Sequence, residues 1–416
     1  MGELIQNYTF YYPLFMAYVW IIGALYFFFR WEKPQGKPED IPELPSYPLV
    51  SILIPCFNEA SHISETINFL SELKYPNYEI LAINDGSSDE TGVVLDSLLP
   101  ENSRLRVLHL ATNQGKAVAL RSGSMVANAE FLVCIDADAL LDPMAVHWIM
   151  KQFLFGPRVG AVTGNPRTRS RSTLLGKIQM GEFSAIIGLI KRAQRIYGRV
   201  FTVSGVVSAF RKTALHRVGY WSQNIMTEDV DISWRLQLAH WDIRYEPHAL
   251  CWILMPETLS GLLKQRLRWA IGGNEVILMN LGHLFKWTSR RMWLVFFEHF
   301  CSVLWCLTLF VMVILWILGF FFPIPEKYLV VSIIPTWPGV VLGLTCLLQF
   351  TISLLLDSRY EKGSYRYYFI MIWYPLVYWA INWITTLVAL PRALLHNPKK
   401  RARWHTVDRG ITEAEI

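Results

Sequence analysis

Three short clusters of polar residues, in a fixed order, carry the side chains that could do chemistry. Asp136 and Asp138 follow an apolar run, Glu228 and Asp229 come later, and Gln-Arg-Leu-Arg-Trp occupies 265–269. Carboxylates at alternate positions of an extended chain point to one side, where they can bind a cation such as Mg²⁺ or Mn²⁺. Such a cation neutralises a diphosphate leaving group. The order therefore favours metal-assisted transfer from a diphosphate, with a base and an aromatic residue further along the chain.

The second cluster has two interpretations. Inverting transfer of a sugar needs a base within hydrogen-bond reach of the acceptor hydroxyl, and the carboxylates after Thr227 supply candidates. Carboxylates are also stabilised at a helix N-terminus, and a helix is predicted over 230–239. Capping therefore explains one of the two carboxylates as well as catalysis does.

The third cluster lies on a predicted amphipathic helix. Arg268 could clamp a diphosphate, and Trp269 could stack on the ring of an acceptor sugar. Arginine and tryptophan are also common where a helix lies at a membrane surface. The two interpretations are compatible, because a catalytic domain held at a membrane would need both.

Further candidates sit at predicted strand ends and at a helix start. Asn58 and Glu59 follow the first strand and could contact a nucleotide, although both also suit a helix N-terminus. Asp85 ends the second strand and can accept from the N3–H of uracil, while 87–89 are expected to cap the next helix. Lys116 could place a point charge on a diphosphate. A lone Gly-Lys pair lacks the spacing of a P-loop.

The scaffold that brings these residues together is read from hydrophobic periodicity. Short apolar strands alternate with helical patterns, which predicts an α/β fold with a parallel, doubly wound sheet. Ligands bind at the carboxyl ends of such strands, so Asn58, Asp85 and Asp136 should share a site. The predicted strands are 49–55, 79–85, 106–110 and 130–136, and the helices between them are 60–73, 88–99 and 115–128.

Composition points to a membrane protein. The 416 residues are 53% hydrophobic and 14% aromatic, too apolar for an ordinary soluble chain. The net charge of +6 fits basic flanks of membrane segments, and no basic stripe with interleaved aromatics predicts nucleic-acid binding. The six cysteines form no CxxC pair, so a disulfide framework is not expected.

Composition also divides the chain. Arg30, Lys33 and Lys37 follow the first apolar segment, which favours an outside N-terminus and a cytoplasmic catalytic domain. The predicted parts are an N-terminal membrane helix (1–30), a proline-rich linker (31–48), the catalytic domain (49–275), an interfacial helix (276–293), a membrane region (294–391) and a basic tail (392–416).

The number of C-terminal crossings stays open. Apolar segments cover 294–322, 328–356 and 366–391, and three crossings would put the basic tail outside. The excess of positive charge predicts the tail inside. Either one segment is re-entrant or interfacial, or the tail departs from the tendency, and Pro335 and Pro338 make 328–356 the weakest crossing.

Arg167, Arg169 and Arg171 alternate in a polar stretch. They could border the site or contact lipid headgroups. A solvated loop is the expected arrangement, because alternating charges are usually hydrated.

The order of the clusters resembles the processive branch of glycosyltransferase family 2, which includes cellulose, chitin, hyaluronan and poly-N-acetylglucosamine synthases. The resemblance covers about residues 50–275 and is closest to the bacterial poly-β-1,6-N-acetylglucosamine synthases. The blocks that carry this closer resemblance lie at 226–234, 245–247, 251–258 and 264–269.

The resemblance implies a GT-A, Rossmann-like domain with transmembrane helices. It implies an inverting polymerase that moves N-acetylglucosamine from UDP-N-acetylglucosamine to a growing polysaccharide and exports it. The implied roles are base for Asp229 with Glu228 in support; nucleotide binding for Asn58, Glu59, Asp85, Lys116, Asp136 and Arg268; Mg²⁺ or Mn²⁺ binding for Asp136 and Asp138; and acceptor binding for Thr227, Gln265, Arg266 and Trp269.

The same resemblance implies a multi-pass protein of the bacterial inner membrane, often with a small membrane partner subunit and regulation by cyclic di-GMP. Two alternatives are a chitin- or hyaluronan-type synthase and a single-sugar, lipid-linked transferase, which the 265–269 motif opposes. A third is a transport protein with a degenerate enzyme domain, which intact Asp136, Asp138 and Asp229 oppose.

Overall fold

The computed structural model describes residues 2–169, 171–330, 337–361 and 363–395. At its centre lies an eight-stranded sheet in the order β3-β2-β1-β4-β7-β6-β8-β5. The strands are β1 Val50–Cys56, β2 Tyr78–Asp85, β3 Leu105–Leu110, β4 Phe131–Ile135, β5 Leu140–Leu141, β6 Val159–Thr168, β7 Val207–Arg211 and β8 Asp242–Ile253.

The sheet is parallel in one half and mixed in the other. The strands β3, β2, β1 and β4 are parallel, as predicted. The expectation of a parallel sheet is wrong beyond β4, because β7 runs antiparallel to both β4 and β6, and β5 runs antiparallel to β8. The α/β class is confirmed.

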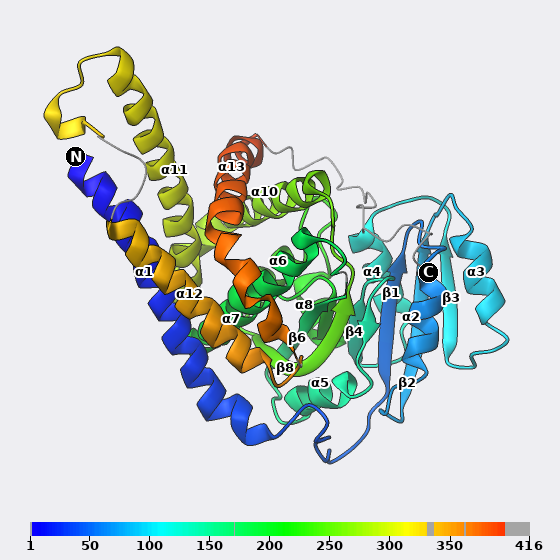
Figure 1. The fold of residues 1–416 in the computed structure, drawn as a ribbon. Helices are drawn as coiled ribbons and strands as arrows, with labels where there is room; N and C mark the ends of the chain where they lie inside the picture. The colour runs from blue at the N-terminus through cyan, green and yellow to red at the C-terminus, as the bar shows by residue number, and fades with distance from the viewer. Residues whose placement is uncertain (1, 170, 331–336, 362, 396–416) are drawn as a thin grey trace.

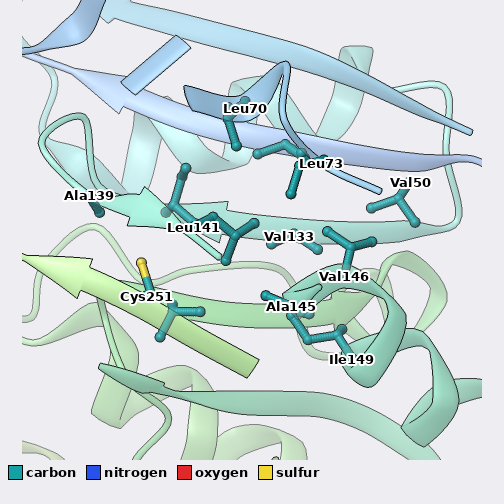
Figure 2. Packing of buried hydrophobic residues seen from close by; sticks show 14 of the residues in the cluster. Val50, Leu70, Leu73, Val133, Ala139, Leu141, Ala145, Val146, Ile149 and Cys251 are labelled. Carbon is teal, nitrogen blue, oxygen red and sulfur yellow. The ribbon is translucent and has the colours of Figure 1, made fainter. Parts of the chain in front are cut away.

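Helices cover both faces of the sheet (Figure 1). Val146 and Ile149 of one of them, α5, pack in one cluster with Val133 of β4 and Cys251 of β8 (Figure 2). Trp148 of α5 and Trp234 of α9 are fully buried, so each contributes a large apolar area to the fold. The helices of this domain are α2 Ile63–Leu70, α3 Thr91–Leu98, α4 Lys116–Val126, α5 Ala145–Leu154, α6 Leu174–Glu182, α7 Leu189–Tyr197, α8 Lys212–Val218 and α9 Glu228–Leu238, with a π-helical segment Phe183–Gly188 between α6 and α7.

Long apolar helices lie beside the domain (Figure 1). They are α1 Gly2–Phe27, α10 Leu259–Leu284, α11 Trp293–Phe321, α12 Trp337–Asp357 and α13 Tyr374–Leu394. Short π or 3-10 segments cover Phe28–Glu32, Lys33–Gln35, Trp287–Met292, Glu326–Tyr328 and Ser364–Trp373. The predicted boundary at residue 275 thus falls inside α10, and helical turns reach into the predicted linker.

Among the described residues, three helices are long and apolar enough to cross a membrane. They are Glu3–Gln35, Trp287–Phe321 and Trp337–Asp357. The predicted segment 366–391 is not among these candidates within the described residues; it runs through the 3-10 segment Ser364–Trp373 into α13. Most of the predicted basic tail, 396–416, lies outside the described residues, as does Pro335.

A buried ionic cluster joins the π-helical segment that continues α1, and the end of α12, to the domain. The Arg192 guanidinium donates to Glu32 at 2.7 Å and lies 3.0 Å from an Asp357 oxygen, while Arg167 donates to the other Asp357 oxygen at 2.8 Å. All four side chains are at most 2% exposed. The prediction of a solvated loop is therefore wrong for Arg167, which lies in β6.

The two later arginines of this stretch are also ion-paired. Arg169 donates to both oxygens of Glu65, at 3.1 and 2.7 Å. Arg171 pairs with Glu361 and donates to the carbonyl of Thr168. These pairs hold the chain that leaves β6 against two other parts of the protein.

Candidate active site

The candidate residues gather at one edge of the sheet. The parallel strands β1, β2 and β4 end there, and Asn58, Asp85 and Asp136 lie at or just beyond those ends. The antiparallel β7 begins at the same edge, because Val207 pairs with Ile135. Loops from both halves of the sheet therefore reach one place.

Lys116 joins three of these loops. Its Nζ donates to Asp136 Oδ1 at 2.5 Å and to the carbonyl of Gly205 at 2.9 Å, and Glu228 Oε1 lies 3.6 Å away. Burial alone would lower the pKa of Lys116, but the carboxylates of Asp136 and Glu228 hold it above its ordinary value. The ammonium therefore stays charged beside the predicted metal ligand.

Asp229 lies at the start of α9. Its Oδ1 accepts from the backbone N–H of Val230 at 2.9 Å, and its other oxygen lies near Gly205. Burial and the neighbouring charge of Glu228 raise the pKa of Asp229 to about 6, although Lys116 and Arg268 act in the opposite direction. A carboxylate with this pKa is suited to exchange protons near neutral pH.

Asp85 holds the loop before α4. Its two oxygens accept from the backbone N–H groups of Gln114 and Gly115 at 2.9 and 2.7 Å. Gly86 has a φ of +63°, and a Cβ there would lie 2.4 Å from the Thr112 carbonyl carbon, so the close approach requires glycine. Contact of Asp85 with a base would use the remaining lone pairs of the carboxylate.

The loop after β1 is held by the loop after β2. Asn58 has a φ of 55°, and its Oδ1 accepts from the backbone N–H of Ser88 at 2.9 Å. Ser87 Oγ accepts from the Asn58 N–H at 3.0 Å, so capping of α3 is wrong for both serines. Asp89 does accept from the N–H of Thr91, the first residue of α3, at 3.0 Å.

Glu59 lies on the same loop after β1. It is 1% exposed, and its backbone N–H donates to Thr91 Oγ1 at 2.8 Å. Since α2 begins only at Ile63, neither Asn58 nor Glu59 starts a helix. The loop is therefore anchored on both sides, which suits a residue pair that must hold one position toward a ligand.

The donor set at Asp136 and Asp138 fits a hard cation. No group of three or more His, Cys, Asp or Glu side chains within the described residues could by itself hold a metal. Magnesium commonly takes one or two carboxylates from the protein and completes its shell with water and phosphate oxygens. Two carboxylates that directly follow β4 match that pattern.

The predicted 265–269 motif lies in α10 and divides between two environments. Arg268 is exposed, and its charge lowers the pKa of Asp229. Arg266 is buried, pairs with Glu182 at 2.5 Å, and stacks its guanidinium over Trp269 at 4.3 Å from the ring centroid. Arg268 thus acts on the edge of the sheet that carries Asp136, Glu228 and Asp229, which we call the carboxylate edge. Trp269 packs on the buried Arg266–Glu182 pair.

Two predicted acceptor residues have buried oxygens without a hydrogen-bond partner in the described structure. These atoms are Gln265 Oε1 and Thr227 Oγ1. Thr227 packs on Gly272 of α10, where an added Cβ would lie 2.2 Å from Thr227 Oγ1. The contact fixes α9 against α10 and thereby sets Asp229 relative to the motif.

A cavity of about 520 Å³ begins beside Trp269 and Arg266 and extends between the membrane helices. Its walls come from α1, α7, α10, α11, α12 and α13, and they carry both aromatic and amide side chains, including Trp305, Gln349 and Asn382. Such a surface suits a polar chain with apolar ring faces. Of the candidate site residues, Arg266 and Trp269 line the cavity, so it joins the 265–269 motif to the candidate membrane spans.

Sequence reasoning missed three residues of the site region. Gly205 provides the carbonyl for Lys116, Glu182 holds Arg266, and Lys191 lines the cavity. Lys191 lies in the short amphipathic α7, where its spacing is typical of a solvated lysine. In the structure, however, Lys191 is buried and donates to Thr163 of β6.

Three comparisons with known proteins agree. A profile described as glycosyltransferase like family 2 matches residues 47–272. The poly-beta-1,6-N-acetyl-D-glucosamine synthase of Staphylococcus epidermidis is 39% identical over 411 residues, which are 97% of this chain and 98% of that protein. The protein of the same name from Staphylococcus aureus (strain COL) is 40% identical, over 98% of this chain and 99% of its own length.

A similar solved structure is a mannosyltransferase, PcManGT, from Pyrobaculum calidifontis, in complex with GDP-Man and Mn²⁺. It aligns with a TM-score of 0.59 over 95% of this chain and 96% of its own, at 18% sequence identity. At that identity the likeness bears on the fold alone. It confirms the predicted GT-A glycosyltransferase fold.

Proposed function

The chain belongs to the glycosyltransferase family 2 group, and from that premise we propose that it polymerises N-acetylglucosamine from UDP-N-acetylglucosamine into a β-1,6-linked polysaccharide. The main support for the proposal is that this chain is similar to two such synthases over nearly its whole length. The two synthases match nearly the whole chain, including the helices around the cavity.

The residues divide the reaction between them. Asp136 and Asp138 would hold Mg²⁺ or Mn²⁺, which when bound neutralises the departing diphosphate. Lys116 and Arg268 add positive charge at the same edge. Asp229 takes the proton of the acceptor hydroxyl while the hydroxyl oxygen attacks the anomeric carbon of the donor sugar and UDP leaves.

The acceptor end is proposed to rest on Trp269. An aromatic face contacts the C–H groups of a sugar ring without fixing one hydroxyl pattern, so a chain can slide after each addition. Since Trp269 lines the cavity, the growing polymer would move directly between α1, α11, α12 and α13. Export across the bilayer would follow from repeated addition.

The arrangement of the helices supports a specific topology. The ends of α1 and α12 meet at the catalytic domain through Glu32, Asp357 and Arg192. With three crossings, the N-terminus lies outside, α11 leads outward, and α12 returns to the domain side. We propose that these spans lie in a bacterial inner membrane with the domain on the cytoplasmic side; α13 runs along α10 and also packs on α11, where Trp383 Nε1 donates to the Cys306 carbonyl at 2.9 Å. A small partner subunit and cyclic di-GMP stay expectations from the resemblance.

The test uses the full chain in detergent micelles or nanodiscs. Incubation with UDP-N-acetylglucosamine and Mg²⁺ should release UDP and give a polymer that a β-1,6-specific hexosaminidase degrades. EDTA should stop synthesis, and Mg²⁺ or Mn²⁺ should restore it. A β-1,4-linked product would favour the chitin-type alternative, a single sugar on lipid would favour the lipid-linked transferase, and no UDP release would refute the proposal.

A further inference from the structure

Lys191 is a buried cation beside the cavity. It lies in α7, is 6% exposed, and lines the same cavity as Trp269 and Arg266. Its Nζ donates to Thr163 Oγ1 on β6 at 2.9 Å. An ammonium has three N–H donors, so this bond uses one of them.

Lys191 differs from the other buried cations of this region, because they are paired with carboxylates. Arg192, Arg167 and Arg266 each have a carboxylate at hydrogen-bond distance. No ion pair of the described part of the chain includes Lys191; its Nζ lies 5.9 Å from the centroid of the Tyr245 ring. A buried ammonium without a paired carboxylate is unfavourable, so burial lowers its pKa, and a ligand that accepts from it would favour the charged form.

Lys191 is also linked to the predicted base. Thr163 Oγ1 accepts from the backbone N–H of Ser204 at 2.9 Å, and the next residue, Gly205, lies against Asp229. Burial lowers the pKa of Lys191 to about 7, while the charge of Asp229 acts to raise it. Lys191 therefore lies near Asp229 and lines the cavity, whereas Lys116 contacts the predicted metal ligand Asp136.

We propose that Lys191 is an acceptor-binding residue, whose ammonium donates a hydrogen bond to an oxygen of the terminal acceptor sugar where the chain passes from Trp269 into the cavity. The oxygen-rich surface of an oligosaccharide supplies hydroxyl and amide acceptors at every ring. Trp269 would hold the ring face, and Lys191 would fix its rotation so that one hydroxyl meets Asp229. The inference rests on the proposed function and adds a determinant of which acceptor hydroxyl reacts.

The experiment separates acceptor binding from donor binding. The purified full chain is titrated by calorimetry with a short β-1,6-linked N-acetylglucosamine oligosaccharide and, separately, with UDP. Lys191→Met keeps the length of the side chain and removes the donor. Thr163→Val keeps the ammonium but removes the Oγ1 that accepts from Lys191 and from the Ser204 N–H, and Lys74→Met removes a lysine that is exposed on the domain surface.

Lys191→Met should weaken oligosaccharide binding by about 10- to 100-fold, the effect of losing one charge-assisted hydrogen bond. It should leave the Kd for UDP unchanged, and in turnover it should raise the acceptor KM more than it lowers kcat. Lys74→Met should bind both ligands as the wild type does, and Thr163→Val should lose less than Lys191→Met.

Three results would overturn the proposal. They are wild-type oligosaccharide binding by Lys191→Met, an equal loss in Thr163→Val, or a loss of UDP affinity in Lys191→Met. Failure of the proposed function is seen separately, as a wild-type protein that makes no polymer. Oligosaccharide binding still decides the role of Lys191 in that case, and a wild type that binds no oligosaccharide refutes it.

Discussion

At the residue scale, the carboxylate of Asp229 carries the heaviest chemical demand. Asp229→Asn keeps its shape and the contact with Gly205 but cannot accept a proton. We expect polymer synthesis to fall by about 10²–10⁴-fold, the usual contribution of a general base. Calorimetry should find UDP binding close to that of the wild type. Near-normal synthesis by this variant would assign the base to another residue, with Glu228 as the nearest candidate.

The raised pKa of Asp229 predicts a pH dependence. The base must be deprotonated to act, and burial places its pKa at about 6. Activity at saturating donor should therefore be full above this pH and fall about tenfold per unit below it. The residual activity of Asp229→Asn should lose this acid limb. An identical acid limb in the variant would show that another group titrates.

Arg268 and Trp269 are neighbours with different predicted ligands. Arg268→Ala should weaken UDP binding by about 10-fold or more, since the exposed guanidinium adds charge at the carboxylate edge. Trp269→Ala should keep UDP affinity and lose chain elongation, because its ring lines the cavity. Thermal unfolding of each variant checks that α10 is intact. Full-length polymer from a folded Trp269→Ala protein would exclude the acceptor role.

The sequence predicted the residues of the carboxylate edge but not the buried residues that hold the neighbouring elements in place. Asp136 and Lys116 stand at strand and helix ends, where local pattern alone predicts a ligand site, and the structure brings them together. Lys191 and Glu182 depend on partners that are 28 and 84 positions away, Thr163 and Arg266. Such pairs follow from how β6 and α10 pack on α6 and α7, and no local spacing encodes them.

At the scale of elements, the buried cluster of Glu32, Arg192 and Asp357 fixes α1 and α12 on the domain. Arg192→Met would leave both carboxylates buried without this cation. We expect the free energy of unfolding in detergent to fall by about 3–5 kcal/mol. Arg169→Met, at a partly exposed pair, should change it by about 0–1 kcal/mol. Equal effects of the two variants would mean that the cluster does not hold the helices.

Whether the sequence predicts a strand or helix depends on how local its sequence pattern is. The first four strands were predictable because each is a short apolar run followed by a helical pattern. The antiparallel insertion of β7 between β4 and β6 was not, since β7 is a short run whose direction is set by pairing with Ile135 across the sheet. The continuity of α10 through residue 275 was likewise hidden, because the change from polar to apolar composition suggested a boundary.

At the scale of the whole molecule, the buried ionic cluster bears on how many times the C-terminal part crosses the membrane. Three C-terminal crossings would put the basic tail outside, whereas its charge predicts it inside. With α12 tied to the domain at Asp357, the three candidate spans fit the proposed topology, while α13 packs along both α10 and α11. Most of the basic tail, 396–416, lies outside the described residues, so its side of the membrane stays a prediction. The sequence alone could not decide the number of crossings, because the apolar segment 366–391 also has the length of a crossing. The structure shows that it runs from a 3-10 segment into α13, which packs on α10.

The proposed route of the polymer makes a prediction at the same scale. Thr345 and Leu344 are neighbours on α12, but Thr345 lines the cavity and Leu344 is 61% exposed on the outer face. Thr345→Trp should fill part of the route, so UDP binding and the first transfers persist while polymer length falls. Leu344→Trp adds the same ring to the outer face and should make full-length polymer.

Size-exclusion analysis of the product and thermal unfolding of both variants decide between blockage and misfolding. If Thr345→Trp is as stable as Leu344→Trp and still makes full-length polymer, the chain does not pass between α11, α12 and α13. The catalytic edge would then release its product elsewhere, and the cavity would need another occupant. If only the polymer shortens, the same helices that hold the domain at the membrane also form the path of its product.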